Sequence, residues 1–187
     1  MTIYHNVYTK ACPHMTFPEI LCLYEMIKSL PEDAKILEVG AWKGGSTIPI
    51  GVASKGTGRK ITVVDIWDAP EEQLYNVWLE NVSMEGLLPM IEVARGDSLI
   101  VLKRLLQEKP LYYDFCFLDT SHEYNRTNLE FEMAMELVKI GGWIFMHDIG
   151  DEEPYLYPGC TKVWYEKAQF LLKNQRKVNA FYGGQKL

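Results

Sequence analysis

The hydrophobic and polar positions of the chain form two alternating patterns. Short runs of apolar and β-branched residues recur along the sequence, and longer stretches between them repeat apolar residues every three or four positions. The short runs are typical of buried strands, and the longer stretches are typical of amphipathic helices. Their alternation predicts an α/β fold with a doubly wound, mostly parallel sheet. The predicted strands cover 35–39, 60–65, 91–95, 113–119, 143–147 and 177–182.

Helix start and stop signals divide the stretches between these strands. Thr16 and Glu19 have the spacing of a capping box, as do Asp68 and Glu71, so each pair predicts the start of a helix. The glycine pair at 141–142 follows a helical pattern and predicts its end. Further helical patterns cover 46–54, 98–107, 124–139 and 161–173.

Length and composition indicate one globular domain over 1–187. The chain is 48% hydrophobic and 24% charged, which is the composition of a globular protein with a buried core. Its 187 residues suffice for one core and are too few for two cores of ordinary size. No run approaches the roughly 18 apolar residues of a membrane helix. The first ten residues lack the apolar stretch of a secretory signal. We therefore expect a cytoplasmic protein that has no membrane partner.

Charge and cysteine spacing narrow the range of partners. The net charge is −6 and the lysines are dispersed, which argues against a nucleic-acid partner. Cys12, Cys22, Cys116 and Cys160 are widely spaced and lack the pattern of metal ligands, so we expect reduced and mostly buried thiols. A homo-oligomer stays open at this stage.

A glycine-rich turn joins the first predicted strand to the next helix. Glycines let the backbone approach a ligand closely, and the start of the helix offers unpaired N–H groups. A nicotinamide dinucleotide motif would need its second glycine where Trp42 stands, and an indole there blocks a pyrophosphate. The turn therefore favours a zwitterionic amino-acid group. Its marker residues are Glu38, Gly40, Trp42, Gly44 and Ser46.

Two more strand ends carry polar residues that suit a nucleoside. Asp65 ends the second predicted strand, 25 residues after Gly40, where a carboxylate can accept both hydroxyls of a ribose. Asp97 and Ser98 follow the third strand and are placed to read an adenine edge. Three successive strand ends thus predict one nucleoside ligand.

Segments 113–124 and 141–148, with Asp119, His122 and Asp148, resemble the small O-methyltransferase branch of the class I S-adenosylmethionine-dependent methyltransferases. This branch includes catechol, macrolide-sugar and cephalosporin-tailoring enzymes. The resemblance covers about 35–164. It implies a Rossmann-like core over 35–187 that binds S-adenosylmethionine and catalyses methyl transfer, behind an N-terminal helical lid over 1–30. The cofactor-binding residues it implies are Glu38, Gly40, Trp42, Gly44, Ser46, Asp65, Ile66, Trp67, Asp97, Ser98 and Asp119.

The resemblance also implies a metal and a base. Asp119 and Asp148 would end adjacent strands and, with His147, hold Mg²⁺ or another divalent metal that binds the acceptor hydroxyl. His122 is the candidate general base, and Asp119 is counted as catalytic beside it. The chain departs from the branch in two places. An acid that the branch often has is missing at 120–121 and at His147, and the chain ends just after a glycine pair at 183–184, so the last strand is expected to be curtailed.

The leading hypothesis is an O-methyltransferase that acts on a small hydroxylated acceptor. The alternative is a protein of the same fold that binds the cofactor or acts as a scaffold without catalysis. A nucleotide-dependent oxidoreductase is a third hypothesis, and Trp42 argues against it.

Overall fold

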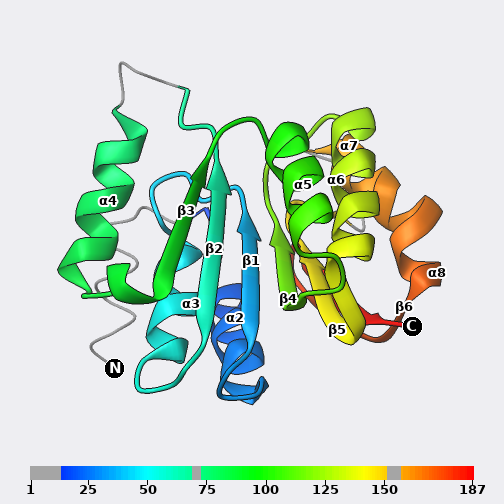
Figure 1. The fold of residues 1–187 in the computed structure, drawn as a ribbon. Helices are drawn as coiled ribbons and strands as arrows, with labels where there is room; N and C mark the ends of the chain where they lie inside the picture. Colours follow the sequence, from blue (N-terminus) through cyan, green and yellow to red (C-terminus); the bar gives the residue numbers. More distant parts are fainter. Residues whose placement is uncertain (1–13, 69–72, 151–156) are drawn as a thin grey trace.

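One seven-stranded sheet runs through the protein (Figure 1). The computed structural model describes residues 14–68, 73–150 and 157–187. The strands are β1 (Lys35–Val39), β2 (Lys60–Asp65), β3 (Ile91–Arg95), β4 (Tyr113–Leu118), β5 (Val138–Met146), β6 (Leu172–Val178) and β7 (Phe181–Lys186). Their order in the sheet is β3-β2-β1-β4-β5-β7-β6, and only the two pairings of β7 are antiparallel. The predicted doubly wound, mostly parallel sheet is confirmed.

Helices cover both faces of this sheet. One face carries α2 (Phe17–Ser29), α3 (Thr47–Ser54) and α4 (Leu74–Met84). The other face carries α5 (Ser98–Glu108), α6 (Tyr124–Leu137) and α7 (Pro158–Val163). Three short helical elements are also present in the described part of the chain: η2 (Leu88–Met90), η3 (Trp164–Ala168) and α8 (Gln169–Leu171).

Side chains alternate between the two faces along each strand, as the two-residue period of a strand requires. Ile36 and Phe115 belong to the core on the α2 face, whereas their neighbours Leu37 and Cys116 belong to the core on the α5 face. Because both faces are buried, the strands are continuous apolar runs in the sequence. Within the described ranges, no helix combines the length and the apolar character that a membrane crossing needs.

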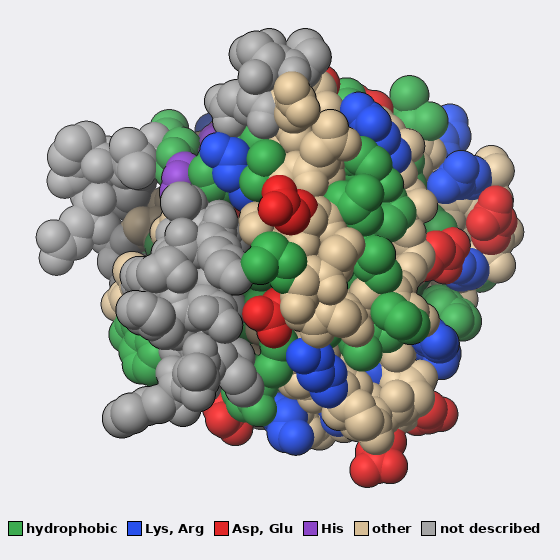
Figure 2. Space-filling model, turned by 90° about the vertical axis from the view of Figure 1, so that its left-hand side faces the viewer, with side chains coloured by type: hydrophobic (Ala, Val, Ile, Leu, Met, Phe, Trp, Pro, Cys, Tyr) green, Lys and Arg blue, Asp and Glu red, His purple; other side chains and the backbone are tan. Residues whose placement is uncertain are grey.

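Figure 2 views the molecule from the side on which α4 and β3 lie. Basic and acidic side chains are interspersed there, with hydrophobic side chains between them. Among the described residues that this view shows, neither sign of charge gathers into a patch.

The C-terminal hairpin corrects the expectation of a curtailed last strand. The strand predicted at 177–182 spans the turn between β6 and β7, where Asn179 has a left-handed backbone with φ 50°. β7 is complete and pairs with both β5 and β6. A Cβ on Gly183 would lie 2.3 Å from the ring of Phe145, so this glycine is needed for β7 to pack against β5. The glycine pair therefore marks close strand packing, and the strand continues through it.

The glycine pair at 141–142, predicted to end a helix, lies inside a strand. The helix α6 ends at Leu137, and β5 runs through Gly141 and Gly142. A Cβ on Gly142 would lie 2.6 Å from the Val138 side chain and 3.0 Å from the Asp114 carbonyl oxygen. The register between β4 and β5 shifts at this level. Glycine in a strand often marks such an irregularity, so the predicted helix end and the predicted strand start at 143 are both wrong.

The N-terminal helix α2 belongs to the core. The predicted capping box at Thr16 and Glu19 is present, and Ile20, Leu23 and Ile27 are buried against the sheet. Residues 1–13 of the predicted lid segment lie outside the described residues.

Two other expectations touch the undescribed parts of the chain. The helix start predicted at Asp68 and Glu71 falls on a gap at 69–72, and α4 begins at Leu74. Cys12 also lies outside the described residues. The other three cysteines are free thiols, of which Cys116 and Cys160 are buried.

Candidate active site

A cavity of about 820 Å³ opens at the carboxyl ends of the parallel strands. This volume lies within the range of about 300–1,000 Å³ that is usual for small-molecule sites. The sheet order reverses between β1 and β4, and ligands of open α/β sheets bind at such a switch point. Of the residues predicted to bind the cofactor, those that line the cavity are Gly40, Trp42, Ser46, Asp65, Ile66, Trp67, Asp97, Ser98 and Asp119.

The turn after β1 is pressed against the end of β4. Gly40 has φ +90°, and a Cβ built on it would lie 1.8 Å from the backbone oxygen of Asp119. Only glycine fits here, both for its backbone conformation and for the space. Gly44 has φ +95° and a Cβ would contact Trp78, on the core side of the turn. Gly44 therefore shapes the turn without lining the cavity.

Glu38 supports this turn from beneath. Its side chain is fully buried and accepts hydrogen bonds from Ser46 Oγ at 2.5 Å and Thr47 Oγ1 at 2.7 Å. Ser46 occupies the N-cap position of α3, but its hydroxyl is directed to Glu38 and does not cap the helix. Burial raises the pKa of Glu38 to about 8, although both hydroxyls favour the charged form. Glu38 is not among the residues that line the cavity.

Replacing Glu38 with glutamine is expected to change how stability depends on pH. Its folded-state pKa of about 8 exceeds the ordinary 4.5, so Glu38 stabilises the fold most below pH 4.5. This contribution is lost as the pH rises toward 8. Glutamine stays neutral, so the free energy of unfolding of Glu38→Gln, measured in urea, should fall less steeply with rising pH between 4.5 and 8 than that of the wild type. Glu25→Gln, on the exposed face of α2, should keep the wild-type decline. Identical curves for Glu38→Gln and wild type would refute this account.

Asp65 joins the turns that follow β1 and β2. Its Oδ2 accepts hydrogen bonds from the backbone N–H of Ala41 at 2.7 Å and of Trp42 at 2.8 Å. Its Oδ1 accepts one from the N–H of Trp67 at 2.8 Å. A carboxylate offers about four acceptor positions, so three of them are filled by the protein itself.

Trp67 both lines the cavity and belongs to the core. It is 3% exposed, and its ring lies 5.1 Å from the rings of Tyr75 and Trp78. Its Nε1 donates to the carbonyl oxygen of Trp42 at 2.8 Å. The indole is therefore held rigidly beside the glycine-rich turn.

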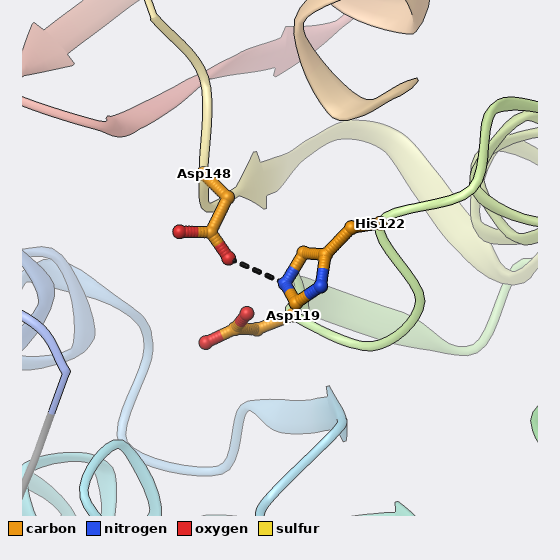
Figure 3. A group of neighbouring side chains, drawn as sticks. All are labelled: Asp119, His122 and Asp148. Carbon is orange, nitrogen blue, oxygen red and sulfur yellow. Dashed lines mark hydrogen bonds and ion pairs between the residues drawn. The ribbon is translucent and has the colours of Figure 1, made fainter. Parts of the chain in front are cut away.

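Asp119, His122 and Asp148 meet beyond the ends of β4 and β5 (Figure 3), and all three line the cavity. One potential ligand atom from each lies within 4.8 Å of the others. His122 Nε2 lies 2.8 Å from Asp148 Oδ2. Asp119 directly follows β4, and Asp148 lies two residues after the end of β5. These two strands are adjacent and parallel. The strand pairing thus brings together residues 29 positions apart in the sequence.

His147 lies behind this group. It is 5% exposed, with Nδ1 3.2 Å from Asp148 Oδ1 and Nε2 3.5 Å from Glu19 Oε2. Alternation along a regular strand would direct one of His147 and Asp148 away from the site. Both line the cavity, because β5 ends at Met146 and Asp148 has a left-handed backbone with φ 62°.

Burial and close charges set the protonation of these groups. Burial raises the pKa of Asp119 to about 6. Burial alone would lower the pKa of His147, but its contacts with Asp148 and Glu19 outweigh it and raise that pKa to about 10. The hydrogen bond to Asp148 raises the pKa of His122 as well. The group of potential ligand atoms contains His122 beside Asp119 and Asp148. His147, the predicted metal ligand, also lies near both aspartates, with Nδ1 3.2 Å from Asp148 Oδ1 and 3.8 Å from Asp119 Oδ2.

Arg126 and Tyr157 line the cavity and were not predicted from the sequence, whereas His14, which also lines it, belongs to the predicted N-terminal lid. The Tyr157 ring stacks on His122 with centroids 3.8 Å apart, and the His14 ring lies 4.6 Å from Trp42. Arg126 lies in the first turn of the helix that follows β4, so its place beside the carboxyl ends of the strands is a signal that could have found it. The sequence carries no comparable signal for Tyr157.

A parallel sheet with a reversed order, an antiparallel β7 and a cavity at the switch point defines the class I S-adenosylmethionine-dependent methyltransferases. The model of the methyltransferase domain family matches residues 37–149, which is more than half of the chain. The chain therefore belongs to the methyltransferase domain family.

Individual relatives agree with this assignment. Tapetum-specific methyltransferase 1 of Arabidopsis thaliana is 32% identical over 110 residues, which cover 58% of this chain and 43% of that protein. The match thus spans less than half of the length of that relative. An O-methyltransferase from Bacillus cereus, solved in complex with SAH, has a TM-score of 0.75 at 18% identity and covers 100% of this chain and 90% of its own. The O-methyltransferase TomG from Streptomyces achromogenes, solved with SAM, has a TM-score of 0.71 at 15% identity, covering 99% and 89%. These structures show the same fold.

Proposed function

We propose that this protein transfers the methyl group of S-adenosylmethionine to a hydroxyl of a small-molecule acceptor, with a divalent metal at the site. The observation that carries the proposal is the group of Asp119, His122 and Asp148. It shares one cavity with the strand-end residues predicted to bind the cofactor. The O-methyltransferases of the same fold that were solved with SAH and SAM support it.

The cofactor would lie along the ends of β1, β2 and β3. Its methionine part would lie at Gly40, Trp42 and Ser46, where the backbone is exposed to the cavity. Asp65 has one acceptor position left beside its three backbone partners, which suits a single ribose hydroxyl. The adenine would lie at the Asp97 end of the cavity, whose other predicted contacts are Ile66, Trp67 and Ser98.

The donor set of Asp119, His122 and Asp148 fits a divalent cation. Carboxylate oxygens are preferred by Mg²⁺, and an imidazole extends the range to Mn²⁺ and similar metals. A bound cation would stabilise the negative charge that develops on the acceptor oxygen. Asp119 and Asp148 would hold either metal. His122 could be a third ligand or could act as the general base.

His122 is suited to act as the general base. With Nε2–H donating to Asp148, the lone pair lies on Nδ1, which can take the proton that the acceptor hydroxyl loses. Asp148 fixes the tautomer and stabilises the imidazolium that results. The stacked Tyr157 ring restricts the imidazole further. The hydroxyl oxygen forms its bond to the methyl carbon as the carbon–sulfur bond breaks, so no covalent enzyme intermediate is needed.

A screen of hydroxylated small molecules, with detection of S-adenosylhomocysteine, tests the proposal. We expect at least one acceptor class to give product in excess over an acceptor-free control. The alternative is a cofactor-binding protein without catalysis, which the missing acids at 120–121 and His147 favour. Cofactor binding in calorimetry together with no product from any acceptor would support that alternative, and no binding at millimolar cofactor would refute both.

Removing divalent metal is expected to stop turnover while the cofactor still binds. Asp119 and Asp148 follow β4 and β5, whereas Asp65 and Asp97 follow β2 and β3. A chelator should therefore lower the rate by roughly hundredfold or more and leave the affinity for S-adenosylhomocysteine unchanged. Adding Mg²⁺ or Mn²⁺ back should restore the rate. Full activity after dialysis against chelator would remove the metal from the proposal.

A further inference from the structure

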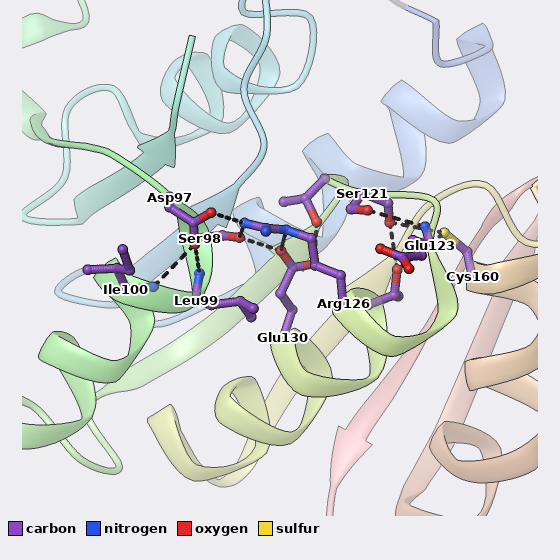
Figure 4. Close-up of polar contacts among 11 residues, drawn as sticks. Asp97, Ser98, Leu99, Ile100, Ser121, Glu123, Arg126, Glu130 and Cys160 are labelled. Carbon is purple, nitrogen blue, oxygen red and sulfur yellow. Dashed lines mark hydrogen bonds and ion pairs between the residues drawn. The ribbon is translucent and has the colours of Figure 1, made fainter. Parts of the chain in front are cut away.

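Arg126 lies between the loop that follows β3 and the loop that follows β4 (Figure 4). It lines the cavity together with Asp97, Ser98 and Thr120. Its Nη2 donates to Asp97 Oδ2 at 2.7 Å and to Ser98 Oγ at 2.8 Å. A single guanidinium group therefore holds both of the polar side chains that follow β3.

The Asp97 carboxylate is held at both of its oxygens. Oδ1 accepts hydrogen bonds from the backbone N–H of Leu99 at 2.9 Å and of Ile100 at 3.4 Å, which caps α5. Oδ2 accepts from Arg126, and this contact lowers the pKa of Asp97 below its usual value. The carboxylate cannot rotate without breaking the helix cap or the ion pair.

Glu130 fixes Arg126 from the side away from the cavity. It is 1% exposed, one helical turn further along α6, and its Oε1 lies 3.5 Å from Arg126 Nε. The same carboxylate accepts hydrogen bonds from Ser98 Oγ at 2.5 Å and from Thr120 Oγ1. A buried carboxylate with these partners is costly to rearrange. Arg126 is thus anchored to a rigid base and presented to Asp97 in one orientation.

We propose that Arg126 is a positioning residue that sets purine specificity, by holding the Asp97 carboxylate where it accepts the amino group of adenine. This inference rests on the proposed function, because it takes the cavity as the S-adenosylmethionine site. An amino group donates to a carboxylate oxygen, whereas an oxo group at the same place presents a second acceptor and is repelled. A carboxylate that can swing away relieves that repulsion, so discrimination depends on its being held.

Calorimetric titration with S-adenosylhomocysteine and S-inosylhomocysteine tests the inference, because these ligands differ at the 6-position of the purine. We expect the wild-type protein to bind the adenosyl ligand about a hundredfold more tightly than the inosyl ligand. Arg126→Gln should weaken adenosyl binding about tenfold and reduce the preference to below about tenfold. Arg104→Gln removes the same charge from the exposed face of α5 and should keep the wild-type preference.

The possible results distinguish a failure of the proposed function from a failure of the inference about Arg126. If the wild-type protein does not bind S-adenosylhomocysteine, the proposed function fails. If it binds both ligands equally, or if Arg126→Gln weakens both equally, Arg126 has no part in specificity and the inference is overturned. Should Arg126→Gln not fold, Arg126→Lys replaces it. Lysine keeps the charge but lacks the planar fork, so it should also show a reduced preference, and an unchanged preference overturns the inference.

Discussion

Gly40→Ala is expected to lower the free energy of unfolding by more than about 4 kcal/mol, or to prevent folding. The added Cβ would lie 1.8 Å from the Asp119 carbonyl oxygen and 2.5 Å from its carbonyl carbon. That backbone cannot retreat easily, because the N–H of Asp119 donates to the Val39 carbonyl oxygen at 2.9 Å. The turn and the end of β4 would have to separate. Urea unfolding followed by circular dichroism measures the loss.

Gly56→Ala is the matched control for this substitution. Gly56 also has a left-handed backbone, with φ +76°, but a Cβ there would meet nothing within 4 Å. It should cost only the conformational penalty of alanine at positive φ, about 1–2 kcal/mol. The difference between the two variants isolates the contact with Asp119. Equal unfolding midpoints for the two would contradict the close approach of the glycine-rich turn to β4.

His122→Ala is expected to reduce turnover at least about a hundredfold while S-adenosylhomocysteine binding stays at the wild-type level. The imidazole contacts Asp148 and Tyr157, which follow β5, whereas the strand ends assigned to the cofactor are those of β1, β2 and β3. Its loss should therefore remove the proton acceptor without disturbing the cofactor. The measurement is the rate of methyl transfer to an acceptor found in the screen, with calorimetry in parallel.

Two observations would separate a base from a structural histidine. A general base must be neutral to act, and the Asp148 contact raises the pKa of His122 above its ordinary 6.5. The wild-type rate should therefore rise with pH through a value above 6.5, and this rise should disappear in His122→Ala. Added imidazole should restore part of the lost rate. A variant that turns over at the wild-type rate would place the base elsewhere.

The strand ends were the most predictable part of the molecule. Parallel strands bring their carboxyl ends to one edge, so acids that end successive apolar runs must lie near one cavity. Asp65 and Asp97 were grouped with the glycine-rich turn on this ground alone, and Asp119 joined them through the resemblance to the methyltransferase branch. The structure places all three aspartates in the wall of one cavity. The capping box at Thr16 was equally local and is equally clear in the structure.

Features that depend on contacts between distant segments could not be predicted. Gly142 and Gly183 are glycines because Val138 and Phe145 would meet any side chain there, and no local pattern distinguishes that from a helix stop or a chain end. The role of Glu38 likewise depends on the direction of its side chain. A carboxylate beside a glycine-rich turn looks like a ligand contact, but it points to Ser46 and away from the cavity.

Glu19, on helix α2, contacts both His147 and the turn of the C-terminal hairpin. Besides its contact with His147, its Oε1 accepts a hydrogen bond from the N–H of Ala180 in the turn between β6 and β7, at 2.7 Å. The helix α2 and the β6–β7 hairpin are thus joined through Glu19 beside His147. A displacement of either element that moves Glu19 away would lower the pKa of His147, because the contact with Glu19 helps to raise it.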